Sequence, residues 1–387
     1  MTTSGDIAMK RTPSPSVRRS GTAGRSNAGN ELLLYIGSYN TAKRKGIHAF
    51  RFDATTGRLT SMGLATEAVN PTFVTASRDG RFLYATKEVA RHEGRKSGSV
   101  KAFAINRRTG KLRFLNEVAS GGAIPCYVAL DKTGRYALVA NYGSGSVEVI
   151  GVRRDGRLGK VTAFDKYAGS SVNPDRQEGP HAHSINVSPD NRFAIAADLG
   201  LDKVFVYRFD AKTGALTPNN PAYAVVNAGS GPRHVAFARN GRFVYVIGEM
   251  KSNITTFAYD ARGGILHKLQ TIATLPKGHK GQSDCAEVAV SPNGKFVYGS
   301  NRGHDSIAVF AADPKKGTLT AVERVSSGGK CPRHFAIDPT GRYLLVANQE
   351  SHTVVVFAVD RKTGRLTATG ETAAVRSPAC VRFVTFG

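Results

Sequence analysis

A turn signal that recurs about every fifty residues constrains the fold of this chain more than any other feature. Each copy is a short turn followed by Arg or Lys and then an apolar strand, and copies occur at residues 79–81, 133–135, 190–192, 240–242, 293–295 and 340–342. Successive copies are 54, 57, 50, 53 and 47 residues apart. Repeats of roughly 40 to 50 residues are typical of propeller blades, whereas helical solenoid repeats are shorter. The sequence therefore predicts a ring of similar blades.

Each repeat contains the parts of a four-stranded antiparallel blade. A first strand is followed by the turn, a second strand, a polar loop, a third strand, a Thr-Gly turn in most copies and a fourth strand. Six complete repeats begin near Pro71, Pro125, Pro180, Pro232, Cys285 and Pro332. The 42 glycines and 16 prolines suit such a chain of short strands and tight turns.

The two ends of the repeat region complement each other. Residues 32–38 resemble a second strand without its first, and residues 377–383 resemble a first strand with no blade after it. Their pairing would complete a seventh blade and remove two exposed sheet edges. We therefore predict an all-β fold, a seven-bladed β-propeller of four-stranded antiparallel blades over residues 31–387, closed by the N- and C-terminal strands. Residues 1–30, rich in Ser, Gly and Arg, are expected to form a disordered basic tail.

Charge and composition limit the partners of this fold. The chain has 54 Lys and Arg against 29 Asp and Glu, a formal charge of +25, which favours small anionic ligands or acidic partners. Few aromatic residues accompany the basic ones, which argues against nucleic-acid binding, and no apolar run is long enough to cross a membrane. The oligomeric state stays open, with a monomer favoured.

Four cysteines without a Cys-x-x-Cys pair suit free thiols in a reducing compartment. Because no hydrophobic segment follows Arg18 and Arg19, we also expect no export, and the expected location is the cytoplasm.

Ionisable and polar residues that could bind a ligand or catalyse a reaction gather at one end of the predicted propeller. We call this end the mouth. The connections into each first strand and the loops between second and third strands share this end, because alternate connections of an antiparallel blade lie on the same side. The candidates there are His183, Arg233, His234, Glu249, Glu287, Arg302, His304, Arg333, Asn348 and Gln349. Several ionisable groups on one concave surface favour a ligand or catalytic site. Motifs for serine nucleophiles and nucleotide cofactors are absent from the sequence.

Three segments at the mouth resemble one known family. Asn301-Arg302-Gly303-His304-Asp305-Ser306-Ile307-Ala308-Val309-Phe310, Gly231-Pro232-Arg233-His234 and Ala347-Asn348-Gln349-Glu350-Ser351 are similar to segments of the seven-bladed propeller lactonases, which include 6-phosphogluconolactonase and fungal carboxymuconate-lactonizing enzyme. The resemblance runs from about residue 32 to the C-terminus. It implies an active site of His, Arg and Glu, and the matching positions are His183, Arg233, Glu249 and Arg302. Glu287 and Arg333 are second-rank candidates, and the other mouth residues are expected to bind substrate.

Opening a lactone needs a base to activate water and donors for the oxyanion. Arg233 and Arg302 suit the donor role and Glu249 or His183 the base, so both bases stay open, and the scheme needs no metal or cofactor. The resemblance implies hydrolysis of a sugar lactone, foremost 6-phosphogluconolactone to 6-phosphogluconate in the pentose phosphate pathway. The alternatives are a non-catalytic propeller that binds an acidic partner, or an enzyme that forms or opens the lactone of a different carboxylated substrate.

Overall fold

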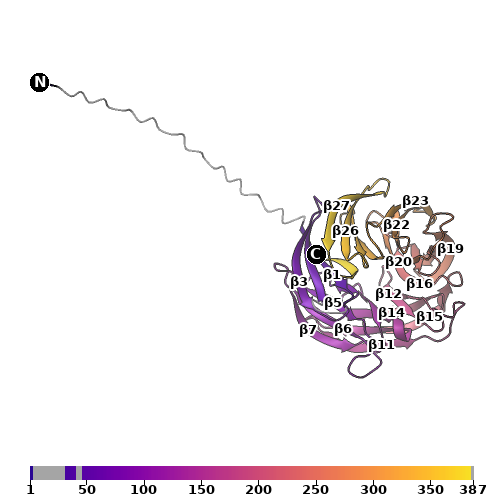
Figure 1. Ribbon diagram of the computed structural model, residues 1–387. Coiled ribbons are helices and arrows are strands. Elements are labelled where there is room, and N and C mark those ends of the chain that lie inside the picture. The colour runs from indigo at the N-terminus through magenta and orange to yellow at the C-terminus, as the bar shows by residue number, and fades with distance from the viewer. Residues whose placement is uncertain (3–30, 41–45, 385–387) are drawn as a thin grey trace.

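The computed structural model describes residues 1–2, 31–40 and 46–384, and it shows seven four-stranded antiparallel sheets arranged around a central axis (Figure 1). This arrangement confirms the predicted seven-bladed propeller. Most of the predicted tail, residues 3–30, lies outside the described residues. Among the described residues, no helix is long and apolar enough to cross a membrane.

The strands follow the chain blade by blade, with the first strand of each blade nearest the axis. Blade 1 contains β4 (Val74–Ala76), β5 (Phe82–Lys87), β6 (Ser99–Ile105) and β7 (Leu112–Ala119). Blade 2 contains β8 (Pro125–Leu130), β9 (Tyr136–Asn141), β10 (Ser146–Val152) and β11 (Leu158–Lys166), and the 3-10 helix η1 (Tyr142–Ser144) joins β9 to β10. Blade 3 contains β12 (Ala182–Val187), β13 (Phe193–Asp198), β14 (Lys203–Asp210) and β15 (Ala215–Val225). Blade 4 contains β16 (Pro232–Phe237), β17 (Phe243–Gly248), β18 (Asn253–Asp260) and β19 (Ile265–Ala273).

The remaining blades repeat this order. Blade 5 contains β20 (Asp284–Val290), β21 (Phe296–Arg302), β22 (Ser306–Ala312) and β23 (Leu319–Ser326). Blade 6 contains β24 (Pro332–Ile337), β25 (Tyr343–Asn348), β26 (Thr353–Val359) and β27 (Leu366–Ala374). Blade 7 contains β28 (Pro378–Val384), β1 (Glu31–Ser38), β2 (Gly46–Asp53) and β3 (Leu59–Glu67).

Blade 7 closes the ring as predicted. β28 pairs antiparallel with β1, and the register places Leu34 opposite Phe383 and Ile36 opposite Val381. The two ends of the propeller are thereby joined in one sheet, so the strand edges that each would otherwise expose are covered.

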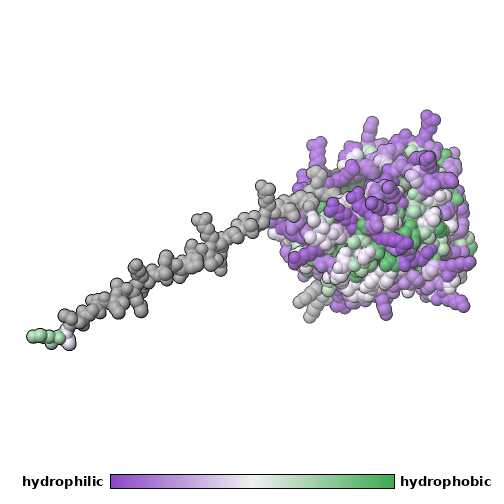
Figure 2. All heavy atoms as spheres, turned by 90° about the horizontal axis from the view of Figure 1, so that it is seen from above, coloured by the Kyte–Doolittle hydropathy of each residue, from purple (hydrophilic) through white to green (hydrophobic). Residues whose placement is uncertain are grey.

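Middle strands lack the alternation of polar and apolar residues because both of their faces pack against neighbouring blades. Every residue of β9, β13 and β17 is buried. The hydrophobic core therefore consists of side chains packed between adjacent sheets. In the side view of Figure 2, hydrophilic side chains cover most of the surface, with a smaller hydrophobic area near its middle.

The two repeated turn signals meet at the contacts between blades. Tyr136 at the start of β9 packs against Gly214 in the β14–β15 turn of the next blade, and its hydroxyl donates to the carbonyl of Lys212, 2.7 Å away. Gly214 has a φ of +76°, and a Cβ there would lie 2.3 Å from the Tyr136 ring. The same pairing occurs at Phe82 with Gly156, Phe193 with Gly264, Phe243 with Gly317, Phe296 with Gly364 and Tyr343 with Gly57. The repeat visible in the sequence is thus the contact that builds the ring.

Candidate functional site

Bulges in the innermost strands bring the predicted first-strand residues to the axis. In β16, Pro232 pairs with Gly248 and His234 with Ile247, which leaves Arg233 outside the ladder. His183 in β12 and Arg333 in β24 occupy equivalent bulges. A bulge frees a side chain from the alternation of the sheet and re-aims it. His183, Arg233 and Arg333 accordingly line one small axial cavity at the mouth, of about 10 Å³.

Glu249 is surrounded by three arginines. It directly follows β17, only 5% of the residue is exposed, and its Oε1 accepts a hydrogen bond from Arg176 Nη2 at 2.7 Å. Arg233 Nε and Arg302 Nη2 each lie 2.9 Å from its Oε2. Burial alone would raise the pKa of this carboxyl, but the charges of Arg302 and Arg233, together with Arg176, outweigh burial and lower the pKa to about 2. Glu249 is therefore a carboxylate at neutral pH, and it holds three guanidinium groups together.

The arginines keep hydrogen-bonding capacity after these contacts. Arg233 Nη1 donates to the carbonyl of Ala286 at 2.7 Å, and Arg302 Nη2 donates to that of Cys285 at 2.8 Å. The Nε–H groups of Arg233 and Arg302 are buried and have no hydrogen-bond acceptor among the described residues, since the Arg233 N–H is not aimed at the nearby carboxylate oxygen. Two positioned donors therefore remain for an oxygen of a ligand.

Arg333 is held on the other side of the small cavity. Its Nη2 donates to the hydroxyl of Tyr39 at 2.8 Å, and that hydroxyl donates to Glu88 Oε1 at 2.8 Å. The guanidinium also lies over the Tyr39 ring, 4.9 Å from its centroid. The mouth thus gathers four guanidinium groups, which suit the binding of an anion.

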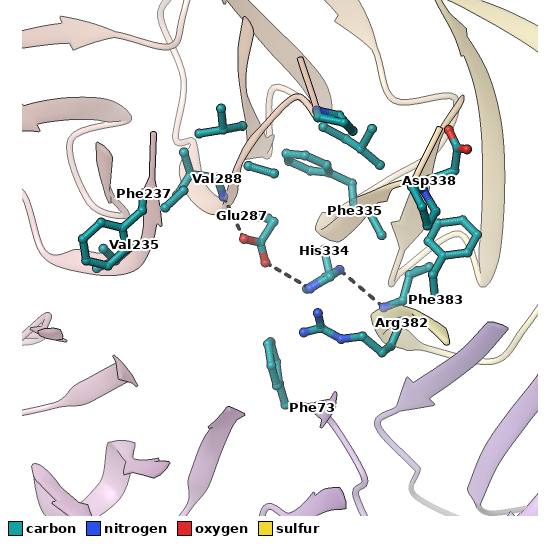
Figure 3. A pocket seen from close by; sticks show the side chains of 18 of the residues that line it. Phe73, Val235, Phe237, Glu287, Val288, His334, Phe335, Asp338, Arg382 and Phe383 are labelled. Carbon is teal, nitrogen blue, oxygen red and sulfur yellow. Dashed lines mark hydrogen bonds and ion pairs between the residues drawn. The ribbon is translucent and has the colours of Figure 1, made fainter. Parts of the chain in front are cut away.

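One layer below, His234, Glu287 and His334 form a row across the axis in which both rings contact Glu287 Oε2. Figure 3 shows the contact between Glu287 and His334. Arg233 Nη1 donates to His234 Nε2 at 3.2 Å, so the proton of this ring lies on Nδ1, which is 3.0 Å from Glu287 Oε2. The amide of Val381 donates to His334 Nδ1, which places the other ring's proton on Nε2, 3.1 Å from the same oxygen.

Burial lowers the pKa of both histidines, that of His334 to about 3, and raises the pKa of Glu287. Both rings are thus neutral at pH 7, and His234 supports Arg233 from below through its Nε2.

His183 differs from these two histidines because its ring has no carboxylate partner among the described residues. Its Nδ1 lies 3.6 Å from Cys126 Sγ, and its ring stands edge-on to those of His234 and Tyr142. Burial, followed by the charges of Arg233, His234 and Arg333, lowers its pKa well below 6.5. His183 is therefore an unprotonated imidazole beside the arginine cluster at neutral pH.

Three predicted substrate-binding residues have their contacts elsewhere at the mouth. Asn348 is fully buried at the end of β25, where its Nδ2 donates to the carbonyl of Ser327, as Asn141 does to Ser120 in blade 2. His304 contacts Ser306 and the ring of His279. Gln349 contacts Cys331. Their roles in substrate binding remain predictions.

Sequence reasoning missed two charged residues of the site. Arg176 lies in the long connection between β11 and β12, which carries no repeat signal that could place it. Asp284 pairs in register with Arg302 and lines an open cavity of about 300 Å³ beside it. Burial, followed by the charge of Glu249, raises the pKa of Asp284. Its position at the start of a first strand, the place where His183 and Arg233 also lie, was the available signal.

The donor set does not resemble a metal or disulfide centre. All four cysteines are free thiols, as predicted. Over residues 31–40 and 46–384, no group of three or more His, Cys, Asp or Glu side chains is arranged to hold a metal ion. What the geometry offers is an array of guanidinium donors next to a neutral imidazole.

Known proteins are similar to this chain in sequence and in fold. A family model described as "Lactonase, 7-bladed beta-propeller" matches residues 33–383. The 6-phosphogluconolactonase of Bacillus subtilis (strain 168) is 35% identical over 306 residues, 79% of this chain and 84% of that protein.

Two solved structures are similar over nearly their whole length. A candidate 6-phosphogluconolactonase from Bacteroides fragilis is 34% identical, with a TM-score of 0.86, and the match covers 93% of this chain and 99% of that one. The periplasmic gluconolactonase PpgL of Pseudomonas aeruginosa is 35% identical, with a TM-score of 0.85, over 92% of this chain and 100% of that one.

Proposed function

Because the chain belongs to the seven-bladed β-propeller lactonase family, we propose that it hydrolyses 6-phosphogluconolactone to 6-phosphogluconate at the mouth. The observation that carries this proposal is the cluster of Arg176, Arg233 and Arg302 around Glu249. A phosphorylated sugar lactone brings a dianionic phosphate and a carbonyl that becomes an oxyanion, and guanidinium groups bind both. The similarity to the Bacillus subtilis 6-phosphogluconolactonase supports this substrate.

Arg233 and Arg302 suit the reacting carbonyl. The unpaired Nε–H groups of Arg233 and Arg302 are the donors available for an oxyanion. Because both side chains are held by Glu249 and by backbone carbonyls, they need little reorganisation when charge develops. Arg176, on a connecting segment and with its side chain more than a third exposed, suits the distal phosphate.

His183 is the better candidate for the base. Both oxygens of Glu249 already contact guanidinium groups, so neither is free to take a proton from water. His183 is neutral at pH 7, and no hydrogen-bond partner of its Nε2 lies among the described residues. We therefore assign Glu249 the role of holding the arginines and His183 that of activating water.

The reaction then follows from these positions. His183 takes a proton from water, and the water oxygen forms a bond to the lactone carbonyl carbon. The resulting oxyanion accepts hydrogen bonds from Arg233 and Arg302. The bond from this carbon to the ring oxygen breaks, and the ring oxygen receives the proton from the His183 imidazolium. The product is the open hydroxy acid, which ionises.

A second candidate substrate is gluconolactone without the phosphate. The similarity to the periplasmic gluconolactonase of Pseudomonas aeruginosa favours this alternative, since that protein matches this chain as closely as the Bacillus enzyme does. The two substrates differ in the charge that Arg176 would bind.

Hydrolysis of both lactones by the purified protein tests the proposal. We expect saturable acceleration above the spontaneous rate, with kcat/KM higher for 6-phosphogluconolactone. Arg176→Ala should reduce this preference by about tenfold or more, the value of one charge-assisted contact, while Arg342→Ala, which removes an exposed arginine from a turn far from the mouth, should leave it unchanged. Rates equal to the spontaneous ones for both lactones would refute a lactonase, and equal kcat/KM values would favour gluconolactone.

A further inference from the structure

A second cavity opens at the opposite end of the axis from the mouth, and the proposed function does not use it. It has a volume of about 490 Å³ and is lined by the first strands of blades 4 to 7 and the turns that follow them. The row of Glu287 and His334 forms its inner end (Figure 3). We call it the rear cavity.

Arg382 is a positioned cation in the rear cavity. Its Nε donates to the carbonyl of Val74 at 3.2 Å, and its guanidinium lies 5.9 Å from the centroid of the Phe73 ring. Figure 3 shows the guanidinium pointing toward the axis, between His334 and Phe73. Its two terminal nitrogens have no hydrogen-bond partner in the part of the chain that the structure describes. Two donors in one plane are thus presented to the cavity.

The carboxylates on the wall do not hydrogen-bond to the terminal nitrogens of Arg382. Glu287 Oε2 contacts His234 and His334, and its Oε1 accepts from the amide of Val288. Asp338 has both oxygens occupied, one by the amides of residues 342 and 343 and the other by Thr340. Neither forms an ion pair with Arg382, and Arg239 adds a second positive charge to the lining. The lining thus carries two arginines and two carboxylates, and the terminal nitrogens of Arg382 are its available donors for an anionic group.

The remaining lining defines the body of that anion. Phe237, Val288, Phe335 and Phe383 line the cavity together with Phe73. An apolar ring or chain gains from burial against these side chains. The two terminal nitrogens of Arg382 match the two oxygens of a carboxylate in a planar, bidentate pair.

We propose that the rear cavity binds a small monocarboxylate with an aromatic or aliphatic body, whose carboxylate pairs with the terminal nitrogens of Arg382. This site is separate from the mouth and takes a ligand unlike a sugar lactone or its acid.

Titration calorimetry of the full chain with 2-naphthoate tests this site. We expect one bound molecule per chain, an affinity about tenfold or more lower in Arg382→Met because the charge-assisted pair is lost, and unchanged binding in Arg342→Met, which removes a turn arginine of the same face outside the cavity. The neutral 2-naphthalenemethanol should bind no better to the parent than to Arg382→Met, and gluconate should not compete. No binding of 2-naphthoate, or equal binding by Arg382→Met, would overturn the proposal.

A crystal structure of the unaltered protein with 2-naphthoate gives a test that does not depend on the folding of a variant. The proposal requires the ring against Phe73 and Phe383 with its carboxylate on Arg382. A naphthoate bound only to the arginines of the mouth would contradict it.

Discussion

Replacing Glu249 by Gln tests whether its charge holds the arginine cluster together. The pKa of this carboxyl falls from its ordinary value of 4.5 to about 2 in the folded protein. Each pKa unit corresponds to about 1.4 kcal/mol, so ionised Glu249 contributes about 3 kcal/mol to the free energy of unfolding at neutral pH. Loss of one partner from a buried ion pair has a similar cost, about 3 to 5 kcal/mol.

The sign of this contribution fixes its pH dependence. Because the folded protein holds the carboxyl with a lowered pKa, the stabilisation is fully present above about pH 4.5 and disappears as the pH falls through about 2. Urea unfolding should therefore show Glu249→Gln less stable than the parent by about 3 kcal/mol at pH 7, with the difference shrinking to well under 1 kcal/mol by about pH 2.

A matched control is Glu31→Gln, which removes an exposed ion pair to Arg51 and should change stability by at most about 1 kcal/mol at any pH. A difference between parent and Glu249→Gln that stays constant from pH 7 to 2, or that is no larger than for Glu31→Gln, would refute the electrostatic role of Glu249.

Three further predictions concern catalysis, blade packing and ring closure. His183→Gln should reduce kcat by about 10² to 10⁴-fold with little change in KM. The kcat/KM of the parent should stay constant from pH 8 to 6.5, because the pKa of His183 lies well below 6.5. A fall in kcat/KM centred near pH 6.5 would contradict the assignment of His183 as the base. In thermal unfolding, Gly214→Ala should lower the Tm clearly more than Gly63→Ala does. Both glycines have positive φ, but only at Gly214 would the added Cβ lie 2.3 Å from an aromatic ring, that of Tyr136. Equal decreases in Tm would mean that the Tyr136 ring can move aside without destabilising the protein. A chain that ends at Arg376 lacks β28, so it should expose the edge of β1 and associate in size-exclusion chromatography; a monomer of unchanged heat stability would show that closure is dispensable.

The fold could be predicted from the sequence because its repeated turns are also its packing contacts. Gly214 and Tyr136 lie 78 positions apart, yet each belongs to a motif that recurs in nearly every blade. The two local motifs together therefore indicate one long-range contact between neighbouring blades. The unmatched strands at the two ends of the repeat region predicted closure for the same reason, since only pairing with each other could complete a blade.

The site was predictable only where the repeat fixes a position. Arg233 and His183 begin first strands and Glu249 follows a second strand, so blade topology alone places them at the mouth. Arg176 lies in an irregular connection whose path depends on tertiary contacts, and no local pattern links it to Glu249, 73 positions away. The separate roles of Glu249 and His183 could not be predicted from the sequence either, because they depend on which of the two side chains contacts the guanidinium groups.

The most direct test of the central claim is a crystal structure of the protein with 6-phosphogluconate, the product of the proposed reaction. The account predicts that the product lies at the mouth, with its carboxylate within hydrogen-bonding distance of Arg233 and Arg302 and close to His183, and its phosphate on Arg176. A product bound only in the rear cavity, or a mouth from which Glu249 and its arginines exclude it at saturating concentration, would contradict the claim that this cluster is the active site.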